Sequence, residues 1–171
     1  MTAHIVVGYT ATKAGRDAVA FGARLARATG AVLDVSIVVP GADRSVITTP
    51  ADGYSRVLRD QAQHWIAEAI DRIPEDVIAH AQIRAAESFA AGLESIAHEL
   101  DARCIVVGAS DGALRGHHRL GSTTTELVHS SDVPVVLVDE LHEVLAVGFD
   151  VGVLLLEELV AFLERFVFLE C

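Results

Sequence analysis

The chain has 171 residues, of which 51% are hydrophobic and only 5% aromatic, and its formal net charge is −11. This is long enough for one domain with a mostly aliphatic core, and the acidic balance argues against nucleic acid or an anionic membrane as a partner. The two cysteines form no disulfide framework, no signal peptide is recognisable, and no uncharged run is long enough to span a membrane. We therefore expect a cytoplasmic protein.

Apolar runs and helical patterns alternate along the chain. Helices are expected after residue 10 up to Gly30, over 58–73 up to Pro74, over 89–100 and over 123–130. Strands are expected at 5–7, 32–39, 77–84, 103–107 and 133–138. The third strand alternates in polarity, which indicates a position near a sheet edge, and Pro134 places the fifth strand at an edge or makes it begin late.

Five strands joined by four crossover helices predict an α/β fold with a parallel, doubly wound sheet and helices on both faces. Ligands of such sheets bind beyond the carboxyl ends of the strands, where the winding reverses. Gly8 and Gly108 both end a strand pattern. If the first and fourth strands are neighbours, residues 8–10 face Gly108 across a crevice, and the turn at Gly121 closes its third side.

The segment 104–125 has the pattern of an anion site. An apolar strand ends at Gly108, a loop with cationic members follows, and Gly121-Ser122-Thr123-Thr124 opens a helix. Backbone N–H groups, a helix dipole and several hydroxyls would then converge on a phosphate. The simpler alternative is that Thr123 only caps the helix, with Glu126 three residues later completing a capping box.

Residues 4–139 resemble a universal stress protein domain, a Rossmann-like fold with strand order 3-2-1-4-5. One branch of this family binds ATP through a spaced glycine motif. In this motif two residues separate the first glycine from the second, nine separate the second from the third, and Ser or Thr follows the third. Gly108, Gly121 and Ser122 fall in register with that pattern, whereas Asp111 replaces the middle glycine. An acidic side chain there is unfavourable beside phosphates, and a non-glycine residue restricts close backbone approach.

The resemblance also implies the remaining nucleotide contacts. The acidic residue of the family that meets the adenine end aligns with Thr10, and its apolar adenine contact aligns with Ile37. The implied ligand is ATP, with Mg²⁺ as a companion ion. The expected nucleotide-binding residues are Gly8, Tyr9, Thr10, Ile37, Val107, Gly108, Asp111, Gly121, Ser122, Thr123 and Thr124.

A cationic loop lies between the two halves of the motif. Arg115, His117, His118 and Arg119 either contact phosphate oxygens and offset Asp111 or form a solvated loop. Adjacent histidines rarely share one ion, and no cluster of cysteines or carboxylates completes a shell, so no metal site is expected.

The sequence contains none of the Walker, pyrophosphatase-loop or nucleotidyltransferase motifs that related folds use for catalysis at phosphates. We therefore expect a non-enzymatic stress-response sensor or regulator that binds an adenine nucleotide, with slow hydrolysis at most. The alternative is a nucleotide-free homodimeric adaptor for protein interactions. The resemblance implies pairing of subunits through the fifth strand, whose apolar edge needs covering.

Residues 140–171 lie outside the family pattern and form a separate acidic and apolar extension. They contain seven Asp or Glu residues and one Arg, so they carry −6 of the net charge, and residues 151–168 are nearly all apolar. On a helical wheel the charged side chains of this stretch share one narrow stripe, which predicts a helix buried against the sheet, a second subunit or another partner. A reading-frame shift would also explain the abrupt change in composition.

Overall fold

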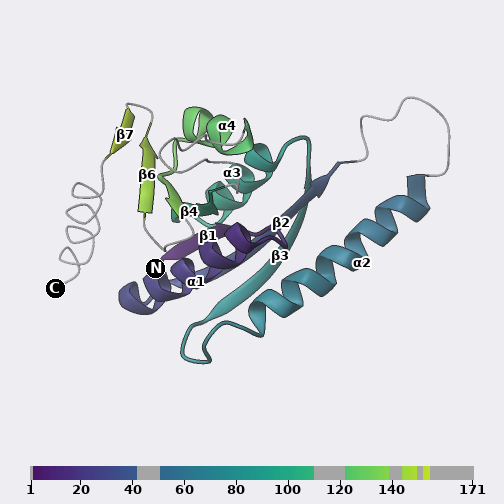
Figure 1. Ribbon diagram of the computed structural model, residues 1–171, viewed down its shortest axis with the longest axis horizontal. Helices are drawn as coiled ribbons and strands as arrows, with labels where there is room; N and C mark the ends of the chain where they lie inside the picture. Colours follow the sequence, from purple (N-terminus) through teal and green to yellow (C-terminus); the bar gives the residue numbers. More distant parts are fainter. Residues whose placement is uncertain (1, 42–50, 110–121, 139–143, 150–151, 155–171) are drawn as a thin grey trace.

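The computed structural model describes residues 2–41, 51–109, 122–138, 144–149 and 152–154. Helices and strands alternate through the first 138 residues, as the sequence predicts (Figure 1). The strands are β1 His4–Gly8, β2 Val32–Pro40, β3 Ala79–Ala86, β4 Ala102–Gly108, β5 Val135–Val138, β6 Val144–Phe149 and β7 Gly152–Leu154. The helices are α1 Lys13–Thr29, α2 Ala51–Ile70, α3 Phe89–Glu99 and α4 Ser122–Ser130.

The strands form one sheet in the order β3-β2-β1-β4-β5-β6-β7. The first five are parallel and follow the order 3-2-1-4-5, so the predicted doubly wound sheet is confirmed. The pairing of β1 with both β2 and β4 marks the point where the winding reverses. Two antiparallel strands, β6 and β7, then extend the sheet beyond β5.

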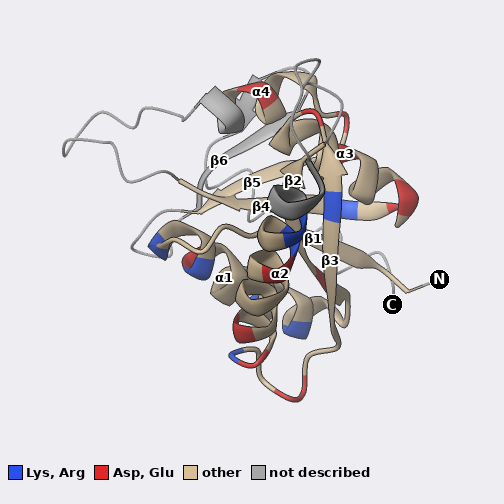
Figure 2. Ribbon diagram, turned by 90° about the vertical axis from the view of Figure 1, so that its right-hand side faces the viewer, with Lys and Arg blue, Asp and Glu red and all other residues tan. Residues whose placement is uncertain are grey.

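Helices α1 and α2 cover one face of the sheet, and α3 and α4 cover the other (Figures 1 and 2). Alternate residues of the central strands supply the two cores, so that Ile5 and Val7 pack toward α1 and α2 while Val6 packs toward α3 and α4. Strands β1, β2, β4 and β5 are buried almost throughout, as expected of parallel strands covered on both faces. No helix in the described part of the chain is long and apolar enough to cross a membrane.

The helix boundaries follow from local chemistry. Thr12 caps α1 by accepting a hydrogen bond from the Gly15 amide at 3.2 Å, and Gly30 ends the helix with φ at +67°. On the other face, the Ser88 hydroxyl caps α3 by accepting a hydrogen bond from the Ala91 amide at 3.1 Å. Both helices therefore begin where a hydroxyl satisfies an amide that has no partner within the helix.

The tail differs from the prediction in two ways. The expected helix over 151–168 is wrong for Gly152–Leu154, which is a strand, and residues 155–171 lie outside the described part. Of the two consequences expected from Pro134, the late start is confirmed, because β5 begins at Val135, whereas the edge position is wrong, because β6 pairs along β5 from Val135 to Val138. The 144–149 segment, VLAVGF, contains β-branched and aromatic residues, which favour a strand. The backbone N–H and C=O groups at the edge of β5 can pair with a strand but not with a helix.

Candidate functional site

The carboxyl ends of β1 and β4 lie next to each other at the centre of the sheet. Gly8, the last residue of β1, is in register with Val107, and Gly108 ends β4 one residue further on. Helix α1 begins at Lys13 and α4 begins at Ser122, each following one of these strand ends along the chain. The structure therefore brings together the two strand ends that the crevice prediction requires.

Gly108 is needed for packing at this point. A Cβ atom there would lie 2.1 Å from the backbone oxygen of Ala14, in the first turn of α1. Gly8 has a different neighbour, because its Cβ would lie 2.6 Å from Leu93 Cδ1, a side-chain atom of α3. The two strand-end glycines thus let α1 and α3 approach the sheet from opposite faces.

The loop between β1 and α1 places Thr10 at the surface of the site. Thr10 is exposed, and its Oγ1 atom lies 3.0 Å from Oγ1 of Thr12. The Thr10 backbone oxygen accepts a hydrogen bond from the Thr12 amide at 2.7 Å, and a Cβ on Gly15 would lie only 1.9 Å from that oxygen. Gly15 therefore allows this tight loop, which leaves the Thr10 hydroxyl accessible to a ligand.

Three of the predicted contact residues are buried. Tyr9 and Ile37 are 2% and 7% exposed and belong to the core beneath α1 and α2. Val107 is 4% exposed and belongs to the core beneath α3 and α4. These side chains support the strand ends from below, and direct contact of Ile37 with a base stays a prediction.

The phosphate-binding half of the predicted site is described only in part. Ser122, Thr123 and Thr124 form the first turn of α4, of which the backbone is described. Asp111 and Gly121 lie outside the described residues, as do the cationic loop positions Arg115, His117, His118 and Arg119. Since α4 begins at Ser122, the cap position is residue 121, and Thr123 lies within the helix, two positions later than a cap.

Helix α1 carries a carboxylate close to these strand ends. Asp17 Oδ2 lies 4.0 Å from Lys13 Nζ, and it is the one buried side-chain nitrogen or oxygen in the described part of the chain without a hydrogen-bond partner. Cys104 in β4 is no candidate nucleophile, because complete burial raises the pKa of its thiol to about 12 and keeps it protonated. No group of three or more His, Cys, Asp or Glu residues that could hold a metal occurs among the described positions.

Polar contacts between α3 and α4 were not predicted from the sequence. Ser88 Oγ donates to Glu126 Oε1 at 3.0 Å, so this hydroxyl caps α3 and holds α4 at the same time. Ser130 donates to Glu94, and His98 Nε2 lies 3.0 Å from Asp132 Oδ1. The pattern Ser88-x-x-Ala91 signals only a cap, and its partner on α4 is distant in sequence, so only the fold reveals this pairing.

A second unpredicted cluster lies within the sheet. Asp34 is 1% exposed, and its carboxylate lies 2.7 Å from His4 Nδ1 on β1 and accepts a hydrogen bond from Gln82 Nε2 on β3 at 3.2 Å. His80 Nδ1 lies 3.6 Å from the same carboxylate. This carboxylate is therefore satisfied by both neighbouring strands, and it holds their side chains in place.

Comparison with known proteins is consistent with this arrangement. A universal stress protein of Mycobacterium tuberculosis is 30% identical over 137 residues, which cover 78% of this chain and 47% of the relative. The chain thus spans about half the length of the curated relatives it matches.

Two solved structures share the fold. A universal stress protein from Archaeoglobus fulgidus in complex with dAMP has a TM-score of 0.60 at 19% identity, covering 80% of this chain and 97% of its own. A universal stress protein in complex with cAMP has a TM-score of 0.61 at 19% identity, covering 81% and 98%. The family model described as the universal stress protein family matches residues 1–139. The chain belongs to the universal stress protein family.

Proposed function

We propose that the chain binds an adenine nucleotide, namely ATP with Mg²⁺, in the crevice above β1 and β4. In this proposal the chain acts as a sensor or regulator in a cytoplasmic stress response. The observation that carries the proposal is the adjacency of these two strand ends at the point where the winding reverses, with α1 and α4 each starting there. Two family members of the same fold are complexes with cAMP and dAMP.

In this proposal the phosphates contact Gly121, Ser122, Thr123 and Thr124, where free amides and the positive end of the α4 dipole favour an anion. The Thr10 hydroxyl contacts the ribose or the base, for which its exposure is suitable. Asp111 weakens the site by repelling phosphate. The chain has no motif for catalysis at phosphates, so we propose binding with slow hydrolysis at most.

The first experiment identifies the ligand directly. Protein purified under native conditions is denatured, and the released small molecules are analysed by chromatography and mass spectrometry. Stoichiometric ATP supports the proposal. An empty protein that also shows no ATP binding by calorimetry contradicts it and favours the nucleotide-free adaptor.

Two variants then test the assignment of residues. Gly121→Leu should weaken ATP binding at least tenfold, because a side chain would occupy the position where backbone amides meet the phosphates. Asp111→Gly should strengthen it by removing a negative charge. The matched control is Gly41→Ala, whose added Cβ would meet the nearest heavy atom at an ordinary 3.5 Å. Unchanged affinity in Gly121→Leu would remove this loop from the site, and weaker binding by Asp111→Gly would make Asp111 a participant, for example as a magnesium ligand.

The adaptor alternative requires a homodimer, and the structure changes how it must be tested. Because β6 occupies the edge of β5, pairing of two copies through β5 requires β6 to leave. Deleting residues 140–171 should therefore expose an apolar strand edge and increase self-association or reduce solubility, measured by light scattering. An unchanged molecular mass and solubility after deletion would contradict an interface role for β5 and for the tail.

A further inference from the structure

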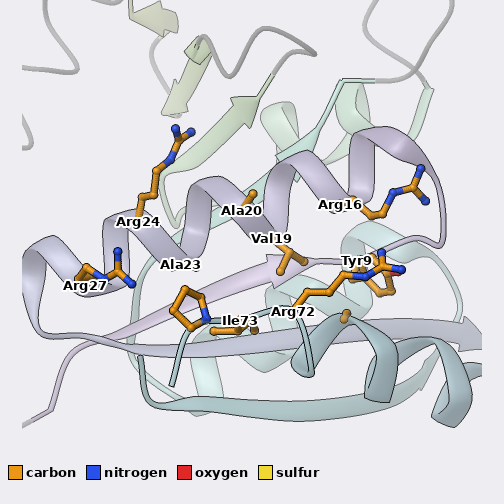
Figure 3. A pocket seen from close by; sticks show the side chains of 11 residues that line it. Tyr9, Arg16, Val19, Ala20, Ala23, Arg24, Arg27, Arg72 and Ile73 are labelled. Atoms are coloured by element: carbon orange, nitrogen blue, oxygen red, sulfur yellow. The ribbon is translucent and has the colours of Figure 1, made fainter. Parts of the chain in front are cut away.

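A pocket of about 350 Å³ lies between α1 and the end of α2, on the face of the sheet away from α3 and α4 (Figure 3). Of the residues expected to bind the nucleotide, only Tyr9 lines this pocket. Its volume falls within the usual range for small-molecule sites, about 300–1,000 Å³.

Four arginines line this α1–α2 pocket, and no acidic residue does. Arg16, Arg24 and Arg27 lie along one side of α1, and Arg72 follows α2. In Figure 3, Arg16 and Arg72 lie toward the end of the pocket that Tyr9 occupies, and Arg24 and Arg27 toward the other. A chain with a net charge of −11 thus concentrates positive charge at one hollow.

The arginines at the two ends differ in their partners. Arg27 NH2 lies 2.6 Å from Asp76 Oδ1, and the guanidinium of Arg24 lies 5.8 Å from the centre of the Phe21 ring. The side chains of Arg16 and Arg72 make no hydrogen bond or ion pair with any residue that the structure describes. The end near Tyr9 therefore has two guanidinium groups available to an incoming anion.

The floor of the pocket is apolar. Val19, Ala23 and Ala69 are 6%, 5% and 3% exposed, and Ile73 lies beside them. Tyr9 is 2% exposed, and its hydroxyl has no hydrogen-bond partner within the described ranges. A ligand that suits this lining has an apolar body and an anionic group that accepts hydrogen bonds at the Tyr9 end.

We propose that the α1–α2 pocket binds a medium-chain carboxylate, with the carboxylate between Arg16 and Arg72 and the aliphatic chain along Val19 and Ala23 toward Pro74. A planar guanidinium matches a carboxylate in a bidentate manner, and such charge-assisted hydrogen bonds are among the strongest in proteins. Arg16 and Arg24 are eight residues apart on α1, about 12 Å at 1.5 Å per residue, which accommodates an extended chain of about ten carbons.

Sodium decanoate is the probe, titrated into the full chain below its micellar concentration and followed by calorimetry. Arg72→Gln and Arg16→Gln should each weaken binding about tenfold or more, because each removes a charged hydrogen-bond donor. Ala20→Phe should abolish it, because Ala20 is an exposed residue of the lining and a ring there would fill the hollow without disturbing the core. Neutral decanol should bind more weakly than decanoate.

Arg59→Gln is the matched control, since Arg59 is an exposed arginine of α2 outside the lining. It should bind decanoate like the unaltered chain. Circular dichroism and the melting temperature show that each variant is folded, and unchanged ATP affinity in Arg72→Gln separates this pocket from the nucleotide crevice. The proposal is overturned if the unaltered chain binds no decanoate, or if Arg72→Gln and Ala20→Phe bind it as well as the control does.

Discussion

The two faces of the sheet are closed in different ways. On one face, α3 and α4 are joined by Ser88–Glu126, Ser130–Glu94 and His98–Asp132 contacts, and they cover a continuous aliphatic core. On the other, α1 and α2 share a core near the sheet but leave a pocket lined by arginines. A sheet buried on both faces can therefore keep one face for structure and leave the other available to a ligand.

The strand-end glycines should show the largest difference. Gly108→Ala should lower the free energy of unfolding by about 3 kcal/mol, because its Cβ would lie 2.1 Å from a backbone oxygen of α1 that cannot move alone. Gly8→Ala should cost less, about 1–2 kcal/mol, because its neighbours are the ends of the Leu93 and Phe89 side chains. Urea denaturation measures both, with Gly41→Ala as the near-neutral control. Equal stability of Gly108→Ala and the control would show that α1 does not approach β4 so closely.

Truncation of one core residue on each face compares their packing. Leu93→Ala should cost about 3 kcal/mol, because Leu93 of α3 is fully buried against the sheet and its truncation leaves a cavity. Ile66→Ala on α2 should cost about 2 kcal/mol, because Ile66 is 5% exposed on a helix beside an accessible pocket, where neighbours can relax. Val57→Ala, 65% exposed on α2, should be close to neutral. A larger loss for Ile66→Ala than for Leu93→Ala would reverse this ranking of the two faces.

The helix caps test the polar links. Ser88→Ala should lower stability by about 1 kcal/mol, since it removes both the α3 cap and the bond to Glu126. Thr12→Ala removes the cap of α1 and should cost about 0.5 kcal/mol. Ser88→Asp keeps a capping oxygen but places it against the Glu126 carboxylate, so it should recover stability only in part. Full recovery in thermal denaturation would show that the link to α4 contributes nothing.

Acid should produce the smallest effect, and it should be similar on both faces. The hydrogen bonds from Arg84 lower the pKa of Glu99 below its usual 4.5, and those from Arg27 lower the pKa of Asp76 below 3.8. Each pair therefore stabilises the fold fully when the pH is above the usual pKa of its carboxyl group. This contribution is lost as the pH falls through the lower pKa of the folded state. Both carboxylates are exposed to solvent, so the contributions are small. Between pH 7 and pH 3, the melting temperature of Glu99→Gln should fall slightly less than that of the unaltered chain. A larger fall would show that the pair does not stabilise the fold at neutral pH.

The tail shows where pattern analysis failed. Residues 151–168 are apolar with a narrow charged stripe, which indicates a helix, yet Gly152–Leu154 is a strand paired with β6. Local periodicity does not report an unsatisfied strand edge elsewhere in the chain, and the backbone partners offered by β6 outweigh it. Of the two expectations drawn from Pro134, the edge position was wrong because β6 pairs along β5, whereas the late start was right, since β5 begins at Val135.

The sequence by itself determined the alternation of strands and helices, the end of α1 at Gly30 and the family, because these depend on residues close together in the chain and on spaced motifs. It also identified Gly8 and Gly108 as special positions at strand ends, to which the structure adds the close approach of α3 and α1. Only the tertiary structure decided that Tyr9 lines one pocket with Arg72 and the arginines of α1, that Ser88 holds Glu126, and that Asp34 lies between His4 and Gln82. These contacts join residues from separate elements, and their geometry exists only once the helices have packed on the sheet.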